Sequence, residues 1–410
     1  MNILYIDHYA GSISMGMEFR PYYMAREWQK MGHTVRIVAA DYSHLRVCQP
    51  EASESFGVRT IDGVDFQVVR AGAYEGNGAK RALSMFRFTG SLWLHAGRLA
   101  KAFQPDLVIS SSTYPLDSYA CHRIAKKSNA KYIHEAHDVW PLTLIELGGM
   151  SKRHPFVVLL NAAEKYAYRK SDKVVSILPG VLPHMLEQGL QSDKKFAYIP
   201  NGVVLDDWNA AEPLGGEHQA FFRQMREEGK FVVAYLGGHA LSNALDQVLD
   251  AAKLMQDKNT VFVLIGKGVE KERLKKRAKD EHIANVFFLP PIPKTQVPNA
   301  LKQADALYIG AAPCSLYRFG VSMNKLYDYM MSGRPVLYGV VASNNEVEEA
   351  GCGFSFDSSK PEEIVNAIEK LMDKPEEDRN RMGAKGKNWV IQNCDYKKLA
   401  ERFLDYTKQN

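Results

Sequence analysis

The sequence predicts an α/β protein with two Rossmann-like domains, each a doubly wound parallel sheet covered by helices on both faces. Three observations predict this fold. Short apolar segments alternate with helical patterns along the chain, which is typical of parallel sheets. The alternation restarts after a break near the middle of the chain. The length of 410 residues exceeds one ordinary core and favours two or three domains.

The first domain is expected over residues 1–203. An apolar strand at residues 3–7 opens it, and a glycine-containing loop follows. Residues 17–31 carry apolar side chains at mixed three- and four-residue steps, which predicts a helix that Gly32 terminates. The later strands of this domain are expected at residues 34–39, 66–70, 107–111, 132–135, 174–178 and 196–199.

The second domain is expected over residues 204–390. A linker with Pro213, Gly215 and Gly216 lies within residues 201–229 and precedes a new buried strand. Its strands are expected at residues 231–236, 261–265, 286–289, 306–309, 335–338 and 353–356. The stretch from residue 361 onward is charged and is expected to be helical.

Composition places the chain among soluble globular proteins, with 46% hydrophobic and 24% charged residues. It has no run of about 18 apolar residues, so no transmembrane helix is expected, and its first residues do not resemble a signal peptide. The five scattered cysteines argue against a disulfide framework or a zinc site and favour a reducing cytosol. We therefore expect a cytoplasmic protein.

Positive charge is concentrated in the N-terminal half. Residues 1–200 contain 24 Lys and Arg against 18 Asp and Glu, a net +6, whereas the remainder contains 28 against 29, a net −1. This suits either an anionic partner, such as a membrane surface or a pyrophosphate-linked substrate, or ordinary surface variation. Residues 79–95 mix cations with large apolar groups, which is typical of either a membrane-surface helix or a plain surface helix. No stacking platform is evident, so no nucleic-acid partner is expected.

Glycine-rich turns follow several of the predicted strands, where ligands bind in open α/β sheets. The loop at residues 10–16 lacks the Gly-x-Gly-x-x-Gly pattern, which argues against a nicotinamide-dependent oxidoreductase. It is either an anion-binding loop or a structural turn. Two such turns follow neighbouring strands of the second domain and together predict a nucleotide site. Its candidate residues are Gly238, His239, Asn243, Gly266 and Lys267.

Residues 315–336 are the most informative stretch. Gly320 to Asn324 predicts a helix start whose exposed amides suit a pyrophosphate. Lys325 adds a positive charge to the first turn, where the helix dipole disfavours it, so a bound anion would explain it. Asp328, one turn further on, is placed to accept hydrogen bonds from ribose hydroxyls. The alternative is an amphipathic helix whose charges only face water.

This stretch resembles glycosyltransferase family 4, whose members have the GT-B fold, with two domains facing a central cleft, and transfer sugars with retention of configuration. Residues 330–336, Met-Met-Ser-Gly-Arg-Pro-Val, match the trailing part of the family pattern. Asp328 stands at the second glutamate of that pattern, whose family role is holding the ribose, and Gly320 stands at the first. Backbone amides near Ser322 and Met323 are therefore expected to contact the donor sugar instead.

The family commonly places an Arg and a Lys at the first glycine turn to neutralise the diphosphate. Here His239 and Asn243 occupy about those places, so we expect Arg318 or Lys325 to supply the charge. Residues 322–330 also resemble the WbuB-like L-fucosamine transferases of O-antigen and capsule assembly. That resemblance implies an N-acetylated 6-deoxyhexosamine, such as L-FucNAc, as the sugar.

In the first domain, residues 134–141 resemble the family segment that holds a His-Asp pair. The resemblance implies that His137 hydrogen-bonds the donor sugar and that Asp138 orients the sugar or the acceptor. A purely structural histidine is the alternative. Residues 391–410 are expected, again by resemblance, to return as a helix onto the first domain. The acceptor-side candidates are Gly16, Glu18 and Arg20.

These features lead to the hypothesis of a retaining glycosyltransferase that moves a sugar from a UDP-sugar to a lipid-linked saccharide, with undecaprenyl diphosphate as the expected carrier. Same-face attack, with Lys325 and the helix dipole stabilising the leaving diphosphate, would need neither metal nor cofactor. A lipid-linked acceptor also favours a peripheral position on the inner face of the cytoplasmic membrane. The rival functions are a GT-B epimerase acting on UDP-N-acetylhexosamine and a non-catalytic sugar-nucleotide-binding protein.

Overall fold

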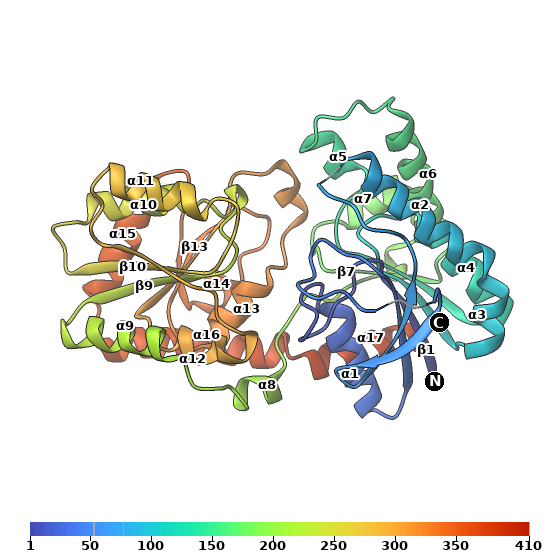
Figure 1. Ribbon diagram of the computed structural model, residues 1–410, viewed down its shortest axis with the longest axis horizontal. Coiled ribbons are helices and arrows are strands. Elements are labelled where there is room, and N and C mark those ends of the chain that lie inside the picture. The colour runs from blue at the N-terminus through green and yellow to red at the C-terminus, as the bar shows by residue number, and fades with distance from the viewer. Residues whose placement is uncertain (52–53, 77, 410) are drawn as a thin grey trace. The chain divides into compact units, whose positions relative to one another are not determined.

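The computed structural model describes residues 1–51, 54–76 and 78–409, which form two compact units (Figure 1). Unit 1 consists of Met1–Pro200, Arg318–Val321 and Tyr396–Asn410, and unit 2 of Asn201–Tyr317 and Ser322–Asp395. The sequence placed the division after residue 203 and assigned residues 318–321 to the second domain. Those residues lie with unit 1 because the Phe319 carbonyl accepts a hydrogen bond from the Gly180 amide, at 2.8 Å.

Unit 1 contains an eight-stranded sheet in the order β3-β4-β2-β1-β5-β6-β7-β8. In β1, Ile3 pairs with Val35 on one side and with Leu107 on the other, and both pairings are parallel. These inner strands are apolar and buried, as parallel strands covered on both faces must be. The strands are β1 (Asn2–Ile6), β2 (Thr34–Ala40), β3 (Gly57–Ile61), β4 (Val64–Val69), β5 (Leu107–Ser110), β6 (Lys131–Ala136), β7 (Lys173–Ser176) and β8 (Phe196–Tyr198).

Strand β3 departs from the sequence prediction, which did not include it. It pairs antiparallel with β4 at the edge of the sheet, with Val58 opposite Gln67. Its residues alternate between half-buried and exposed, so it lacks the apolar run by which the other strands were recognised. An edge position with one solvated face explains that weak signal.

Helices cover both faces of the unit 1 sheet (Figure 1). On one face α4 packs against α2, α3 and α6, and on the other α1 packs against α17. The Trp28 indole of α1 donates a hydrogen bond to the Ala400 carbonyl of α17, at 3.0 Å. The helices are α1 (Arg20–Lys30), α2 (Ala79–Leu94), α3 (Ala96–Phe103), α4 (Asp117–Ser128), α5 (Leu142–Glu146), α6 (Pro155–Lys170), α7 (Leu182–Glu187) and α17 (Tyr396–Lys408).

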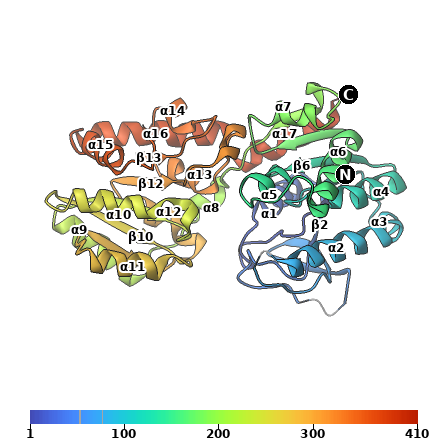
Figure 2. The same cartoon turned by 90° about the horizontal axis from the view of Figure 1, so that it is seen from above.

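Unit 2 contains a six-stranded parallel sheet in the order β11-β10-β9-β12-β13-β14, and Figure 2 looks onto this sheet. Val233 of the central strand β9 pairs with Phe262 on one side and Ala306 on the other. All six residues of β9 are buried. The strands are β9 (Phe231–Leu236), β10 (Thr260–Ile265), β11 (Val286–Leu289), β12 (Ala306–Gly310), β13 (Val336–Gly339) and β14 (Gly353–Ser355).

The helices of unit 2 also form two layers, with α10, α11 and α15 packed on one face of the sheet around a core that includes Leu249, Leu274 and Ile368. Two helices, α8 and α9, lie within residues 201–229, where the sequence predicted the linker. The helices are α8 (Leu205–Asn209), α9 (Gly216–Glu227), α10 (Leu245–Leu254), α11 (Lys271–Asp280), α12 (Val297–Leu301), α13 (Asn324–Met331), α14 (Glu346–Ala350), α15 (Pro361–Met372) and α16 (Glu376–Asn393). Short 3-10 turns lie at Asp193–Lys195, Leu241–Asn243, Lys294–Gln296 and Ser315–Phe319.

The two α/β sheets, parallel except at the edge strand β3, confirm the predicted fold class. Among the described residues, no helix combines the length and apolar character that crossing a bilayer requires.

Candidate functional site

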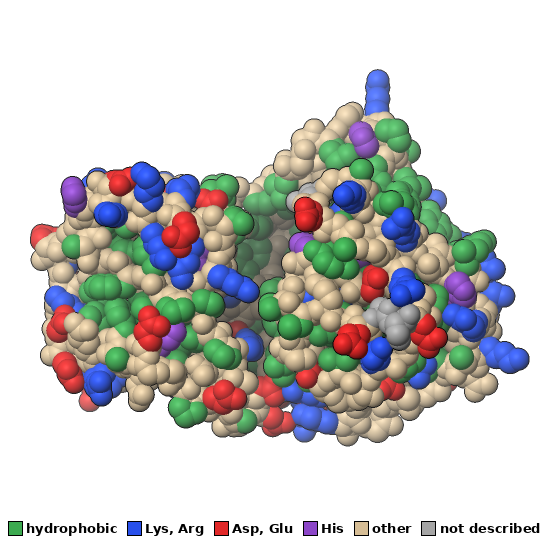
Figure 3. All heavy atoms as spheres, viewed as in Figure 1, with side chains coloured by type: hydrophobic (Ala, Val, Ile, Leu, Met, Phe, Trp, Pro, Cys, Tyr) green, Lys and Arg blue, Asp and Glu red, His purple; other side chains and the backbone are tan. Residues whose placement is uncertain are grey.

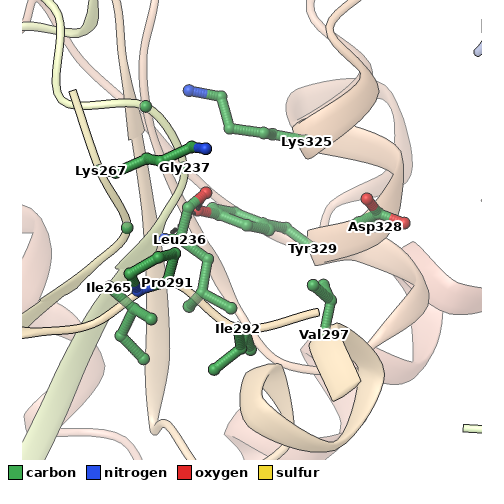
Figure 4. A pocket seen from close by; sticks show the side chains of 12 residues that line it. Leu236, Gly237, Ile265, Lys267, Pro291, Ile292, Val297, Lys325, Asp328 and Tyr329 are labelled. Carbon is green, nitrogen blue, oxygen red and sulfur yellow. Dashed lines mark hydrogen bonds between the residues drawn. The ribbon is translucent and has the colours of Figure 1, made fainter. Parts of the chain in front are cut away.

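A pocket of about 360 Å³ lies at the carboxyl ends of β9 and β10 in unit 2 (Figure 4). Apolar side chains, among them Ile265, Ile292 and Val297, gather on one side of it, while the side chain of Lys325 extends toward the loop at Gly237. This is the edge of a parallel sheet where ligands bind in open α/β folds. The lining residues are Leu236, Gly237, Gly238, Ile265, Gly266, Lys267, Pro291, Ile292, Val297, Lys325, Asp328 and Tyr329.

Glycines at the two strand ends allow the backbone and Lys325 to pack closely there. A Cβ atom at Gly266 would lie 1.9 Å from the carbonyl oxygen of Gly237, and one at Gly237 would lie 2.9 Å from Cδ of Lys325. A side chain at either position would therefore displace a neighbouring turn or the lysine. The glycines that the sequence associated with a ligand are also what brings the β9 turn, the β10 turn and Lys325 together.

Within the described part of the chain, the ammonium group of Lys325 has only neutral hydrogen-bond acceptors. Its Nζ donates to the Tyr235 hydroxyl at 2.9 Å and to Oδ1 of Asn243 at 2.8 Å, and it lies 4.7 Å from the centre of the Tyr235 ring. Burial lowers the pKa of Lys325 to about 8. A bound anion would favour the charged amine and would offset that burial.

Helix α13 begins at Asn324 with no side chain capping it. The first amides of a helix have no intrahelical acceptor, and the helix dipole makes this end attractive to anions. Met323 precedes the helix in an extended conformation. Ser322 holds the chain before it, because its hydroxyl accepts the Asn201 amide at 2.9 Å. Ser322, Met323 and Asn324 therefore lie at the helix start, and none of them is among the residues that line the pocket.

Asp328 and Tyr329 occupy the next turn of α13. The Tyr329 hydroxyl donates to the Leu236 carbonyl at 3.0 Å and accepts from the Leu236 amide at 2.7 Å, which fastens α13 to the end of β9. Asp328 forms an ion pair with Lys294 from the loop after β11. A carboxylate one turn from an uncapped helix start and from Lys325 suits a ligand that carries hydroxyl groups beside an anionic group.

Two of the expected pocket residues are placed differently. His239 is fully buried and is not among the lining residues, and neither of its ring nitrogens has a hydrogen-bond partner among the described residues. Burial, aided by the charge of Lys271, lowers its pKa to about 4, so the ring is neutral at pH 7. Asn243 accepts a hydrogen bond from Lys325 through Oδ1, and its side-chain amide donates to the Gly238 carbonyl at 2.9 Å. Asn243 thus positions the lysine in the structure.

Arg318 and Gly320 lie in unit 1, whereas the sequence placed both in the donor site of the second domain. The Arg318 guanidinium donates to both carboxylate oxygens of Glu146, at 2.8 and 2.6 Å. The segment is held by the Phe319 backbone contact with Gly180 and by the Phe319 ring, whose centre is 5.5 Å from that of His184. Within unit 2, Lys325 and Lys267 are the cations that line the pocket.

Three side chains of the site were not predicted from the sequence: Tyr329, which lines the pocket, and Tyr235 and Lys294, which bind the lining residues Lys325 and Asp328. Tyr235 and Tyr329 read as core aromatics in apolar segments, and Lys294 reads as a loop lysine. Nothing in their local patterns distinguishes them, because each acquires its role from a partner far along the chain. Tyr235 and Lys325, for example, are 90 residues apart.

The corresponding edge of unit 1 carries a buried ionic network around Glu135 at the end of β6. Arg20 is 1% exposed and binds this carboxylate, with its NH2 group 2.9 Å from Oε1. The guanidinium also donates to the carbonyls of Pro200, at 2.6 Å, and Ile199, at 3.0 Å. Arg20 therefore joins the start of α1 to the ends of two strands, β6 and β8, within unit 1, which differs from the acceptor contact that the sequence predicted.

His137 lies in the same network, 13% exposed, with Nε2 2.8 Å from the Ser111 hydroxyl and 3.1 Å from Oε2 of Glu135. Burial alone would lower the pKa of His137, but the hydrogen bond and charge of Glu135 outweigh it and raise the pKa. Burial also raises the pKa of Asp7, at the end of β1, to about 7. Asp7 thus exchanges its proton near neutral pH.

The other predicted residues of unit 1 serve the local backbone. Asp138 accepts the Val139 amide at 2.7 Å and the Thr143 hydroxyl at 2.8 Å, which orders the turn into α5. The Glu18 carbonyl accepts the Gly11 amide at 2.7 Å, and the Gly16 amide donates to the Ser12 carbonyl at 2.8 Å. No group of three or more metal-binding side chains occurs among the residues that the structure describes.

Two family models match the chain, one over each unit. The model described as "Glycosyl transferases group 1" matches residues 217–389, and the model described as "Glycosyl transferase 4-like domain" matches residues 15–202.

Among curated proteins, the probable glycosyltransferase WbjE of Pseudomonas aeruginosa is 21% identical over 315 residues, which cover 74% of each chain. The putative colanic acid biosynthesis glycosyl transferase WcaI of Escherichia coli is 22% identical over 212 residues, or 50% of each chain.

Solved structures resemble the whole chain. Sucrose-phosphate synthase from Thermosynechococcus elongatus aligns with a TM-score of 0.74 at 13% identity, covering 100% of this chain and 98% of the other. Anabaena HepE in complex with UDP-glucose aligns with a TM-score of 0.65 at 14% identity, covering 99% of both chains. At these identities the likeness shows the fold, which is GT-B.

Proposed function

We propose that this chain, a glycosyltransferase with a group 1 domain and a 4-like domain, transfers a sugar from a UDP-sugar to a lipid-linked saccharide in bacterial surface polysaccharide synthesis. The donor binds in the pocket of unit 2, and the acceptor belongs to unit 1. An N-acetylated 6-deoxyhexosamine such as L-FucNAc is the proposed sugar, and an undecaprenyl-diphosphate-linked saccharide is the proposed acceptor. The enzyme works at the inner face of the cytoplasmic membrane.

The observation that carries the proposal is that Lys325 and Asp328 line one pocket and that Lys325 directly follows Asn324, the uncapped first residue of α13. A diphosphate at the helix start would take the Lys325 ammonium from its neutral partners Tyr235 and Asn243. The ribose would bind Asp328, and the base would lie against the apolar side of the pocket. HepE, a structural neighbour, binds UDP-glucose, which supports UDP as the nucleotide.

In the proposed reaction the acceptor hydroxyl attacks the anomeric carbon on the face that the diphosphate leaves. The bond from the anomeric carbon to the diphosphate oxygen breaks, the new glycosidic bond forms, and the hydroxyl proton passes to the leaving phosphate. Negative charge grows on the diphosphate as the bond breaks, and Lys325 and the helix amides stabilise it. The configuration of the sugar is therefore retained.

The surface-polysaccharide assignment is supported by WcaI, whose name places it in colanic acid biosynthesis. Since a lysine and a helix start supply the positive charge, we expect turnover to survive removal of divalent metals. Adding excess EDTA to a donor-turnover assay measures this. A loss of turnover that Mg²⁺ restores would show that a metal neutralises the diphosphate instead.

Calorimetric titration with UDP tests the proposed site. Wild-type protein is expected to bind UDP, and Lys325→Ala to bind it about ten- to a hundredfold more weakly, as expected for loss of a charge-assisted contact. Lys275→Ala is the matched control, because Lys275 lies on the surface of α11 and pairs with Glu272 at 3.0 Å. Equal affinities in all three proteins would refute the site.

A panel of UDP-sugars, followed by NMR of the product, then identifies the sugar and the anomeric configuration. An inverted anomeric centre would contradict the proposed mechanism. Incubation of each donor without an acceptor is the control for epimerisation.

A further inference from the structure

One surface of unit 1 has a composition unlike the rest of the molecule. Helices α2, α3, α4 and α6 form a continuous layer, with α4 packed against the other three. The ring of Phe86 on α2 lies 6.0 Å from that of Phe156 on α6, which links the two outer helices. We call these four helices the basic layer.

The basic layer contains eleven lysines and arginines, three in α2, two in α3, three in α4 and three in α6. Its acidic residues are Asp117 and Glu164, which are 0% and 2% exposed. The four helices, all of whose residues are described, therefore present cations to solvent without exposed carboxylates among them. Like charges gathered in this way repel one another unless an anionic partner is near.

Large apolar side chains are exposed on the same layer. On α2 the exposed fractions are 46% for Leu83, 43% for Phe86, 46% for Trp93 and 72% for Leu94. Their spacing places them along one stripe of the helix, away from the buried side chains such as Phe88 and Leu92. Figure 3 shows hydrophobic side chains at the surface in the region of α2 and α6.

On α6, Val158 is 54% exposed and Leu159 38% exposed. A cation also lies directly against one of the exposed apolar side chains of α2. The Arg123 guanidinium of α4 lies 3.8 Å from the centre of the Trp93 ring. An aromatic ring with a cation on its face is amphipathic and suits the boundary between headgroups and acyl chains.

The positive charge of the basic layer indicates what kind of partner this surface binds. A protein partner of mixed charge would leave many of these cations unpaired, whereas an anionic bilayer offers each of them a phosphate while the apolar stripe reaches the acyl boundary. We propose that the basic layer binds the surface of an anionic phospholipid membrane, with Leu83, Phe86, Trp93 and Leu94 inserted at the headgroup boundary. The contact is interfacial and involves the layer's surface only.

Vesicle co-sedimentation of the full chain tests this surface. We expect binding to vesicles containing phosphatidylglycerol and none to pure phosphatidylcholine vesicles, with binding falling as salt rises. Lys126→Glu with Lys127→Glu should weaken partition at least about 30-fold, since each lost cation at an anionic surface contributes roughly fivefold and the new carboxylates are repelled. Leu83→Ser with Leu94→Ser should weaken it at least tenfold.

Matched controls lie in unit 2. Lys275→Glu with Lys276→Glu makes the same charge change on α11, and Leu254→Ser with Val269→Ser removes side chains that are 53% and 89% exposed. Circular dichroism confirms that each variant is folded. Equal losses in the controls, or equal binding to both kinds of vesicle, would overturn the proposal, as would binding to a protein partner with no affinity for lipid. The affinity for UDP is expected to stay unchanged in all of these variants. A failure of the membrane proposal can therefore be distinguished from a failure of the proposed donor site.

Discussion

The carboxyl ends of the two parallel sheets have the same place in the fold but opposite chemistry. In unit 1 the polar side chains bind one another, with Glu135 held by Arg20, Ser111 and His137. In unit 2 glycines replace side chains at two strand ends, and a pocket of about 360 Å³ remains, where Lys325 donates to the neutral groups of Tyr235 and Asn243. The edge of unit 1 is thus occupied by its own side chains, whereas the edge of unit 2 leaves room for the anion that we propose.

This comparison separates effects on stability from effects on function. Substitutions in the Glu135 network should unfold the protein, because they leave a buried charge unpaired. Substitutions around Lys325 should leave the fold intact and remove binding or turnover.

The largest effect is expected for Arg20→Ala. Removing the guanidinium leaves the Glu135 carboxylate buried without its counter-ion, so we expect the free energy of unfolding to fall by about 3–5 kcal/mol. Urea denaturation measures it. Lys275→Ala is the control, because its pair with Glu272 lies at the surface, with side chains 42% and 82% exposed, and contributes less than about 1 kcal/mol. Similar losses for both variants would show that the network is no more than a surface feature.

Lys325→Ala is expected to lower kcat/KM for the donor by about 10²–10³, with no change in the unfolding transition. The reason is the loss of the cation beside the leaving diphosphate. Lys325→Arg should recover part of the activity, and Lys275→Ala should behave as wild type. Full activity of Lys325→Ala would remove this residue from the reaction.

Asp328→Ala is expected to weaken UDP binding by about tenfold, because a charged hydrogen-bond acceptor for the ribose is lost. Deoxy-UDP analogues sharpen the test. The wild-type protein should prefer UDP over the analogue that lacks the contacted hydroxyl, and the variant should bind both equally. Lys294→Ala serves as the control, since it removes the ion-pair partner of Asp328 but leaves the carboxylate. Retained discrimination in Asp328→Ala would place the ribose elsewhere.

The smallest effect concerns pH. Because the pKa of Lys325 is about 8, its amine is charged below that pH and becomes neutral above it. We expect kcat/KM for the donor to decline as pH rises through 8, approaching tenfold per pH unit. In Lys325→Arg the guanidinium stays charged, so the decline should disappear. An identical decline in both proteins would assign it to another group.

The fold could be predicted from the sequence because the central strands are continuous apolar runs, such as Phe231–Leu236, that only a doubly covered parallel sheet can bury. Strand β3 was not predicted, since its half-exposed alternation gives no such run. The segment Arg318–Val321 was placed in the wrong unit, because local pattern says nothing about the distant Gly180 amide that holds it.

Only those parts of the candidate site that depend on local sequence could be predicted. The glycine turns, Lys325 and Asp328 are recognisable because helix geometry and strand ends are local properties, and the structure brings them to one pocket. The partners Tyr235 and Lys294 are not recognisable locally. Arg20 was expected on the acceptor side, but in the structure it is buried against Glu135, which lies 115 residues away in the sequence. For each of these three residues, a contact with a residue distant in the sequence determines the role of the side chain.

A crystal structure of the protein with UDP tests the central claim most directly. We expect the diphosphate at the start of α13, with Nζ of Lys325 moved from Tyr235 and Asn243 to a phosphate oxygen, and the ribose hydroxyls on Asp328. Nucleotide bound in unit 1, or bound while Lys325 keeps its present partners, would contradict it.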